Sequence, residues 1–399
     1  MQRANTSKAA ANGRENDRQH RQAARQAQLR YANDRQPGIR RQRHGGGFRY
    51  LDRRGRPVRS AEALARIRRL AIPPAWTDVW IAAHENDHLQ ATGRDARGRK
   101  QYRYHPRWNE TRGSDKYASL IEFAKALPRI RRRVGRDLRR RGLPREKVLA
   151  TVVRLLEVSL VRVGNAEYAR ENHSFGLTTM RDRHVDVHGR AIRFHFRAKS
   201  GIDRDLEVSS PRLAKIVRRC QELPGQELFQ YVDEDGRVRD VGSQDVNDYL
   251  RQISQREISA KDFRTWAGTW LAAQALQEFE DFDSGAAANR NVTRAIESVA
   301  ARLGNTKTVC RKCYVHPEVI AAYLDHSLLK TLKQRTDHAL RGDLANLSAE
   351  EGAVLALLEA RMKRHLAGKP PLEEQLKRSI RRRARPGAKR RRHRPRKPR

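Results

Sequence analysis

Four side chains in the middle of this chain are of the types that could break and rejoin a phosphodiester bond. They are a tyrosine, Tyr314, and three cations that precede it, Arg162, Lys199 and Arg264. A phenolate can attack phosphorus and stay covalently attached, while two guanidinium groups hold the non-bridging oxygens as charge develops. Their planar fork matches that geometry better than an ammonium group does. A lysine on a tight turn can protonate the departing sugar oxygen. The set predicts transesterification on a DNA strand.

This chemistry needs no cofactor, because the cations of the protein balance the developing charge. The sequence contains no G-x-x-x-x-G-K-[ST] loop of the kind that cradles nucleotide phosphates. It also shows no clear cage of acidic side chains for a metal ion. We therefore expect catalysis without ATP or metal. Any single arginine is weak evidence in a chain with 86 Lys and Arg residues, so only the four residues as a set carry weight.

The charge of the whole chain predicts a polyanionic partner. Its 399 residues include 86 Lys and Arg against 46 Asp and Glu, a formal net charge of +40. A compact protein this basic repels itself, and a bound polyanion offsets the repulsion. DNA or RNA is the first choice and an anionic membrane the second. No run of about 20 apolar residues is present, so we expect no membrane-spanning helix.

The three cysteines, Cys220, Cys310 and Cys313, are an odd number in a long chain. This favours a reducing cytoplasm over a disulfide framework. The C-x-x-C spacing of the last two leaves three possibilities open. They are a zinc site with His316 nearby, a redox dithiol beside Tyr314, or two unrelated thiols. A zinc site needs two further ligands and no second pair is visible, which favours unrelated thiols.

Composition divides the chain into four expected segments. Residues 1–45 are polar and basic with almost no large apolar side chains, so they cannot offset their ordering entropy and are expected to form a flexible arm. Residues 46–112 are turn-rich and are expected to form a small β-rich DNA-binding domain, ending in a linker near 109–114. Residues 113–370 are expected to form a mainly helical catalytic domain. Residues 371–399 form a basic tail.

Periodicity gives the expected elements and an α+β fold class. Alternation predicts strands near 48–52, 79–82, 89–93 and 102–105. The helical period predicts helices near 61–70, 118–123, 146–163, 210–220, 244–253, 263–279, 292–303 and 349–366. Within the helical part, alternation over 178–180, 184–187 and 191–196 predicts a short three-stranded antiparallel sheet, followed by a turn at Lys199-Ser200-Gly201.

The sequences around the four residues resemble those of type IB DNA topoisomerases, in particular the small bacterial and poxvirus-like enzymes. The matching motifs are R-V-G-N-A-E-Y from Arg162, F-R-A-K-S-G around Lys199, K-D-F-R-T-W around Arg264, and L-G-N from Leu303 in the run that ends at Tyr314. Residues 72–80 and 90–102 are also similar to the β-rich DNA-clamping domain of the family. The resemblance extends from about residue 48 to residue 329.

The resemblance implies a fold and an activity. The fold would be the β-rich domain followed by a tyrosine-recombinase-like catalytic domain that contains the three-stranded sheet, the two forming a C-shaped clamp around double-stranded DNA. The activity would be relaxation of supercoils of both signs through a 3′-phosphotyrosyl intermediate, strand rotation and religation. It would need no ATP, no obligatory metal and no obligatory protein partner, and the enzyme would act as a monomer.

One position departs from the pattern of the poxvirus and nuclear enzymes. These carry a further catalytic histidine upstream of the tyrosine, and the matching residue here is Asn305. Asparagine donates a hydrogen bond but carries no charge. The resemblance therefore implies that Asn305 contacts a non-bridging oxygen in the transition state.

Two other functions are compatible with parts of the sequence. A tyrosine recombinase uses the same nucleophile, but recombinases usually place a histidine three residues before the second arginine, where this chain has Lys261. Their amino-terminal module is also usually helical rather than β-rich. A basic DNA-packaging protein would explain the charge but not the Arg-Lys-Arg-Tyr set. Supercoil relaxation separates all three functions, because packaging alone does not change linking number catalytically.

Overall fold

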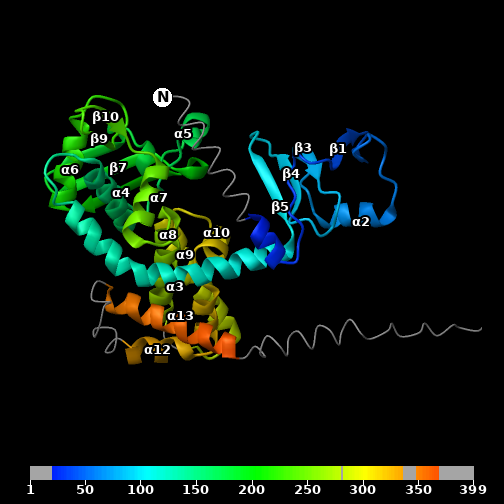
Figure 1. Cartoon of the computed structure of the whole chain (residues 1–399). Coiled ribbons are helices and arrows are strands. Elements are labelled where there is room, and N and C mark those ends of the chain that lie inside the picture. The colour runs from blue at the N-terminus through cyan, green and yellow to red at the C-terminus, as the bar shows by residue number, and fades with distance from the viewer. Residues whose placement is uncertain (1–19, 280–281, 336–346, 368–399) are drawn as a thin grey trace, which may run out of the picture. The chain divides into compact units, whose positions relative to one another are not determined.

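The structure is a computed structural model of the whole chain, and it describes residues 20–279, 282–335 and 347–367. The chain divides into two compact units, Met1–Ser119 and Leu120–Arg399 (Figure 1). Residues 1–19 of the predicted arm and the whole predicted tail 371–399 lie outside the described residues. None of the described helices is long and apolar enough to cross a membrane.

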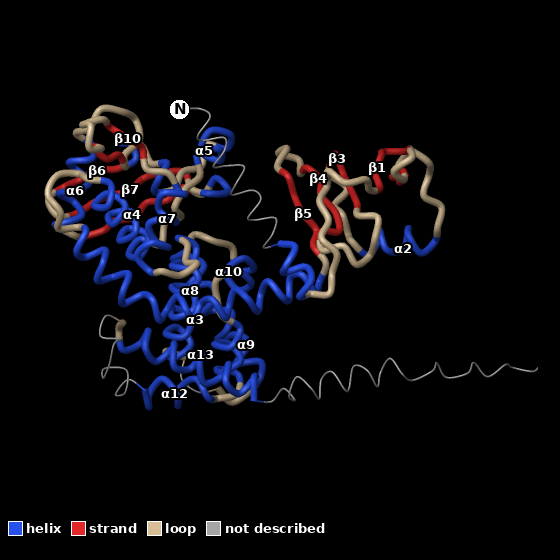
Figure 2. The backbone as a smooth tube through the Cα atoms, in the orientation of Figure 1, coloured by secondary structure: helices blue, strands red, loops and turns tan. Residues whose placement is uncertain are grey.

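The first unit is a five-stranded antiparallel sheet with one flanking helix (Figure 2). The strand order is β2-β1-β3-β4-β5. The elements are β1 (Ile39–His44), β2 (Gly47–Leu51), α2 (Ala61–Arg69), β3 (Thr77–Ile81), β4 (Leu89–Arg94) and β5 (Lys100–Tyr104). Helix α2 and the four strands predicted from alternation are confirmed within a few residues.

Strand β1 lies inside the segment expected to be a flexible arm, so that expectation is wrong for residues 39–44. Ile39 is buried and pairs with Ile81 of β3, while Arg41 lies with its guanidinium carbon 4.1 Å from the ring centre of Phe48. Residues 20–26 are also helical. Their alanines pack in a small cluster with Trp108. Arginines and alanines carry little hydrophobic signal in a sequence, and their burial depends on partners far along the chain.

Helix α3 (Pro106–Asp137) runs without interruption through the linker predicted near 109–114, so that prediction is wrong. The boundary between the two units falls inside this helix, after Ser119. Glycine and charged residues give residues 109–114 the composition of a linker, but a helix tolerates them where its other turns are packed.

The second unit is built around two buried helices. Helix α4 (Arg145–Ser159) and helix α8 (Ala260–Gln277) are apolar on most of their faces, which is typical of helices inside a core. The surrounding helices are α5 (Ala166–Asn172), α6 (Pro211–Gln221), α7 (Ser243–Ser254), α9 (Gly285–Leu303), α10 (Lys307–Cys313), α11 (Pro317–Leu324), α12 (Ser327–Arg335) and α13 (Ala349–Ala367). The helices predicted in this part of the chain are confirmed, apart from shifts at their ends.

The predicted three-stranded sheet exists, but its third strand lies elsewhere in the sequence. Its strands are β6 (Val185–His188), β7 (Ala191–Arg197) and β8 (Asp203–Ser209), in the order β6-β7-β8. Residues 178–180, expected as a strand, lie mainly in a 3₁₀ turn, η1 (Leu177–Thr179), because their polar groups bond to the preceding loop. Two short strands, β9 (Gln230–Val232) and β10 (Val238–Asp240), form an additional hairpin that was not predicted.

Candidate active site

Arg162 lies on a rigid loop that follows helix α4. The helix ends at Leu160, whose φ of 56° turns the chain out of the helical path. The backbone N–H of Leu177 donates to the carbonyl oxygen of Arg162 over 2.9 Å. A Cβ on Gly176 would lie 2.6 Å from that oxygen and 2.6 Å from the Cα of Gly164, so only glycine permits this close contact. The loop is therefore held from both sides.

Arg264 is buried on helix α8 and is only 3% exposed. It donates to the carbonyl oxygen of Leu160 and, over 2.8 Å, to that of Leu303 at the end of α9. Its Nε–H is buried and has no hydrogen-bond partner among the described residues. Burial, followed by the nearby positive charge of Arg162, lowers the pKa of Arg264 to about 10. The guanidinium is thus still charged at neutral pH and keeps a donor available.

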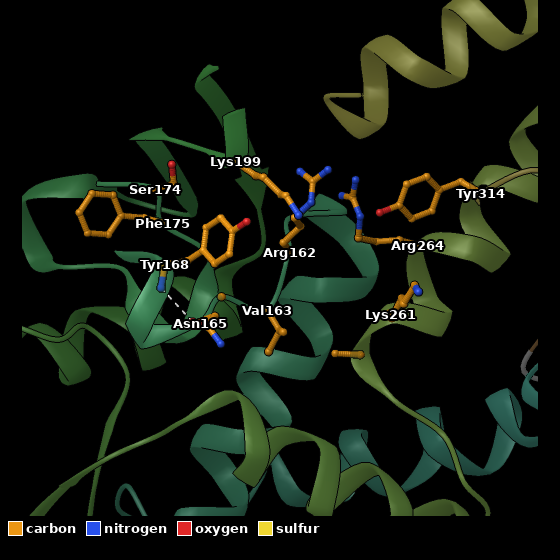
Figure 3. A pocket seen from close by; sticks show the side chains of 12 residues that line it. Arg162, Val163, Asn165, Tyr168, Ser174, Phe175, Lys199, Lys261, Arg264 and Tyr314 are labelled. Carbon is orange, nitrogen blue, oxygen red and sulfur yellow. Dashed lines mark hydrogen bonds between the residues drawn. The ribbon is translucent and has the colours of Figure 1, made fainter. Parts of the chain in front are cut away.

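Tyr314 follows helix α10 and packs against the helix that carries Arg264. Its ring centre lies 5.1 Å from the guanidinium carbon of Arg264. Its backbone N–H donates to Cys310, and its carbonyl oxygen accepts from Thr269 of α8 over 3.3 Å. A Cβ on Gly268 would lie 2.6 Å from the same carbonyl oxygen, so glycine lets the backbones touch. Figure 3 shows the hydroxyl turned toward Arg264.

Lys199 begins the tight turn between β7 and β8, as predicted. Ser200 and Gly201 have φ angles of 72° and 74°, which fold the chain back within three residues. The ammonium nitrogen of Lys199 lies 5.3 Å from the ring centre of Tyr168. In Figure 3 the lysine side chain extends toward Arg162. This exposed position on a turn lets the lysine side chain reach a ligand bound in front of it.

Asn305 lies beside the cationic group rather than in the wall of its pocket. It follows Gly304, which ends α9 with a φ of 60°. Its side-chain oxygen accepts a hydrogen bond from Arg162. Its amide nitrogen is buried without a partner among the described residues. Asn305 therefore orients Arg162 and has a donor left over.

Two arginines hold the end of α9 in place. Arg204 of β8 donates to the carbonyl oxygens of Ala301 and Arg302 over 3.2 Å and 3.1 Å, and Arg264 donates to that of Leu303. The carbonyl oxygen of Ala301 also accepts from the backbone N–H of Gly304, and cations suit the negative end of the helix dipole. The strand after the Lys199 turn is thereby tied to the helix that leads to Asn305.

The predicted residues meet at one pocket of about 320 Å³. Its charged lining residues are all cations, and no carboxylate lines it: Arg162, Lys199, Lys261 and Arg264. Tyr314 and Tyr168 are part of the same wall. Like charges crowded together favour a bound anion, since each cation raises the free energy of the others. The structure thus brings four of the five predicted residues to the pocket and places Asn305 next to it.

Sequence reasoning missed three residues of this site. Lys261 lies three residues before Arg264 on α8, so the helical spacing alone predicts that both face the same side. Tyr168 follows the Arg162 loop on α5. Arg204 carried no signal, because its strand was not predicted.

The C-x-x-C pair gives no sign of a metal centre. Cys310 is fully buried and Cys313 is exposed, and both are free thiols. Burial raises the pKa of Cys310 to about 11, so this thiol stays protonated and is a poor ligand at neutral pH. Among the described residues, no three His, Cys, Asp or Glu side chains gather in a way that could hold a metal ion.

Comparison with known proteins agrees with this fold and site. A family model described as the eukaryotic DNA topoisomerase I catalytic core matches residues 105–340, and one described as the bacterial DNA topoisomerase IB N-terminal domain matches residues 47–95. DNA topoisomerase 1B of Acanthamoeba polyphaga mimivirus is 31% identical over 295 residues, covering 72% of this chain and 87% of the relative. DNA topoisomerase 1B of Vaccinia virus (strain Copenhagen) is 19% identical over 282 residues, covering 68% and 85%.

The two family models match the β-rich unit and the helical unit that bears Tyr314 in turn. The chain belongs to the type IB DNA topoisomerase family. It is therefore a DNA topoisomerase, an enzyme that relaxes DNA through transient single-strand cleavage, and the recombinase and packaging alternatives are set aside.

Proposed function

We propose that this chain relaxes supercoiled duplex DNA with Tyr314 as the nucleophile. The observation that carries the proposal is the meeting of Tyr314 with Arg162, Lys199 and Arg264 at a pocket whose lining holds no carboxylate. A phosphodiester is an anion, and its charge grows as the nucleophile adds. A pocket whose charged residues are all cations stabilises that state more than the ground state, which is the condition for catalysis.

The proposed cleavage step balances without an external reagent. The hydroxyl oxygen of Tyr314 gives up its proton to solvent and forms a bond to phosphorus. The bond from phosphorus to the 5′ oxygen breaks, and Lys199 donates the proton that makes a free 5′-hydroxyl. Arg162 and Arg264 donate to the non-bridging oxygens throughout. The product is a 3′-phosphotyrosyl bond, and religation is the same step in reverse.

Asn305 is proposed as an additional contact in the transition state. Its unpartnered amide N–H would donate to a non-bridging oxygen, while its oxygen keeps Arg162 oriented. An amide does not titrate, so this contact would be equally strong at every pH in the working range. Lys261, on the same face of α8 as Arg264, is proposed to contact the adjacent phosphate.

Neither ATP nor a metal ion is required in this proposal. One phosphodiester is exchanged for another, so the bond energy needed for religation is retained in the phosphotyrosyl link. The three catalytic cations supply the charge that a metal would otherwise supply. This is an expectation from the chemistry of the side chains, and a chelator tests it directly.

Duplex DNA is the proposed partner, bound by one copy of the chain. The net charge of +40 supports binding mainly through backbone phosphates. We propose that the β-rich domain 46–112 and the catalytic domain 113–370 close on the duplex, with the basic segments 1–45 and 371–399 adding contacts without sequence preference. Such an enzyme would work in the cytoplasm, at the nucleoid.

The first test is relaxation of negatively and positively supercoiled plasmid in EDTA without ATP, beside the variant Tyr314→Phe. We expect the unchanged chain to relax both plasmids and to form a covalent DNA complex that detergent traps. The variant should bind DNA but show neither activity, because phenylalanine lacks the attacking oxygen. Relaxation by the variant, or a need for ATP or metal in the unchanged chain, would overturn the proposal.

A further inference from the structure

The two cysteines that precede the nucleophile lie one helical turn apart on α10. Cys310 is in the middle of this helix and fully buried, whereas Cys313 is its last residue and exposed. Residues three apart in an α-helix have Cα atoms about 5 Å from each other. Disulfides join residues whose Cα atoms are roughly 4.4–6.8 Å apart. The backbone therefore brings this pair within reach of a disulfide, the redox dithiol that the C-x-x-C spacing left open.

The two thiols differ in what can reach them. Cys313 is exposed, so a small oxidant in the solvent meets its sulfur directly. Cys310 is covered by the core, and burial raises its pKa to about 11, with Cys313 adding to the rise. An exposed cysteine that is oxidised first, next to a second cysteine that then reacts with it, is an arrangement typical of redox sensors.

The turn that carries both cysteines also holds Tyr314 in place. The carbonyl oxygen of Cys310 accepts hydrogen bonds from the backbone N–H groups of Tyr314 and Val315 over 2.9 Å and 3.3 Å. On its other side Tyr314 touches α8, where Thr269 donates to its carbonyl oxygen and Gly268 leaves no room for a Cβ. Tyr314 is thus fixed between this turn and α8, so a change in the turn displaces it.

A disulfide would distort this turn. Cβ atoms three residues apart on a helix are about 5–6 Å from each other. Cβ atoms joined by a disulfide are roughly 3.5–4.5 Å apart, so the bond draws the end of α10 inward by about 1 Å. Because α8 holds the carbonyl of Tyr314, the phenol would move relative to Arg264. A misplacement of about 1 Å can slow a reaction roughly a hundredfold.

We propose that Cys310 and Cys313 form a reversible disulfide that switches off DNA cleavage by Tyr314. The proposal rests on the proposed function, since it takes Tyr314 to be the nucleophile. Hydrogen peroxide is the oxidant, and a cellular thiol restores the active form. The exposed cysteine senses the oxidant, and the buried one converts its oxidation into a change of backbone at the active site.

The oxidation takes place in two steps that balance. The sulfur of Cys313 attacks one peroxide oxygen, the O–O bond breaks, and the departing hydroxide takes the thiol proton to form water. The sulfur of Cys310 then attacks the sulfur of the resulting sulfenic acid, the S–O bond breaks, and the second hydroxide takes the proton of Cys310. Two thiols are oxidised to one disulfide, and one peroxide is reduced to two waters. A reducing thiol reverses the change by thiol–disulfide exchange.

The first test identifies the bond itself. The full chain is treated with hydrogen peroxide, catalase removes the excess, and the denatured chain is alkylated and digested with trypsin. Arg311 and Lys312 lie between the two cysteines, so trypsin separates residues 308–311 from residues 313–330 unless a disulfide joins them. We expect mass spectrometry to find these two peptides joined after peroxide and separate after dithiothreitol. Cys220, buried in α6, should be alkylated in both samples and is the internal control.

Single-turnover cleavage of a short duplex then measures the effect on Tyr314. The oxidised chain should cleave roughly a hundredfold more slowly than the reduced chain, and dithiothreitol should restore the rate. Its affinity for the duplex should change little, because no cation is lost. Cys313→Ser changes an exposed position and should cleave at the unchanged rate before and after peroxide. Cys220→Ala is the matched control, since it keeps the pair and should lose cleavage as the unchanged chain does.

Three results would contradict the proposal. They are no joined peptides after peroxide, a disulfide-bonded chain that cleaves at the reduced rate, and an equal loss of cleavage in Cys313→Ser. A loss that dithiothreitol does not reverse would also contradict it, because sulfinic acids are not reduced by thiols whereas disulfides are. If the joined peptides form but the reduced chain cleaves no DNA, the proposed function fails and the disulfide itself stands.

Discussion

At the scale of single residues, the candidate site is a set of cations whose charges are only partly satisfied by the protein. Arg264 donates to two backbone carbonyls and still has a free Nε–H, and Asn305 has a free amide N–H beside it. Unpartnered buried donors cost free energy in the empty protein. This free-energy cost is removed when phosphate oxygens accept hydrogen bonds from these N–H groups. The removal of the cost adds to the free energy of phosphate binding.

Arg204 is expected to affect the rate of cleavage, although no sequence pattern marks it as a site residue. It joins the strand after the Lys199 turn to the helix end before Asn305. We expect Arg204→Ala to slow DNA cleavage roughly a hundredfold, since small misplacements of catalytic groups have effects of that size. Arg204→Lys should be intermediate, because one ammonium cannot span both carbonyls as a guanidinium does. Single-turnover cleavage of a short duplex measures both rates.

A sulfur-substituted substrate tells whether Arg204 acts through Lys199. When sulfur replaces the 5′ bridging oxygen, the leaving thiolate needs no proton, so a misplaced general acid matters little. The Arg204→Ala defect should then shrink to roughly tenfold or less. Arg193→Ala is the control, since Arg193 lies on the same sheet but pairs with Glu207 at the surface. Equal defects on both substrates, or an equal defect in the control, would contradict positioning of Lys199.

At the scale of elements, the sequence predicts well those strands and helices that carry their own apolar pattern. Helices α4 and α8 and strand β7 belong to this group. Strands β1 and β8 do not, because most of their side chains are polar or charged and each buries only one residue, Ile39 in β1 and Val208 in β8. They form because neighbouring strands supply hydrogen-bond partners, which is information from distant parts of the chain.

The candidate site was predictable for the same physical reason. Tyr314, Arg162, Lys199 and Arg264 each lie in a short stretch whose own residues form the turn or helix that presents them. Arg204 acts on carbonyls about a hundred residues away, so no local pattern marks it.

The packing of residues 31 and 32 against the residue before β4 involves a buried histidine, His88, which makes the stability of the first unit sensitive to pH. The Nδ1 of His88 accepts a hydrogen bond from the backbone N–H of Ala32 over 3.1 Å, and the ring stacks on Tyr31 and contacts Trp108. Burial lowers the pKa of His88 to about 4. Unfolding restores a value of about 6.5, so the unfolded state binds more protons between these two pH values.

We therefore expect the free energy of unfolding of this sheet to be highest above pH 6.5 or so and to fall as the pH is lowered toward about 4. Between pH 7 and pH 5 the loss should be about 2 kcal/mol. Hydrogen exchange of the amides in β3 and β4, corrected for intrinsic rates, measures it. His88→Asn keeps an acceptor without the titration and should remove most of the dependence, whereas His44→Asn, at an exposed position, should not. A pH dependence unchanged by His88→Asn would rule out this origin.

At the scale of the whole molecule, the distribution of charge matters more than any single contact. A formal net charge of +40 favours binding to any DNA, so specificity for the reaction has to come from the arrangement of cations at the site. The active-site pocket is lined without carboxylates, and elsewhere in the described chain many arginines are paired with acids. Cations without a carboxylate beside them thus lie where a phosphate is expected.

The basic segment 381–399 should act on affinity and not on chemistry. It contains many Lys and Arg residues and no Asp or Glu, and it lies outside the described residues. Deleting it should leave single-turnover cleavage of a short duplex unchanged, because no catalytic residue is removed. Relaxation of plasmid should become less processive and more sensitive to salt, since each lost phosphate contact lowers the slope of log K against log salt by about 1.

A variant in which every Lys and Arg of segment 381–399 is replaced by Gln keeps the length of the tail but removes its charge. It therefore shows whether the effect of the tail on relaxation comes from its charge or from its length. If counterion release is the cause, this variant and the deletion should relax plasmid alike, and both should give partly relaxed intermediates at salt concentrations where the unchanged chain gives only fully relaxed DNA. Unchanged salt dependence after deletion would mean that the folded units alone hold the DNA between cleavage events. Restoration of processivity by the Gln tail would mean that chain length, and not charge, delays release.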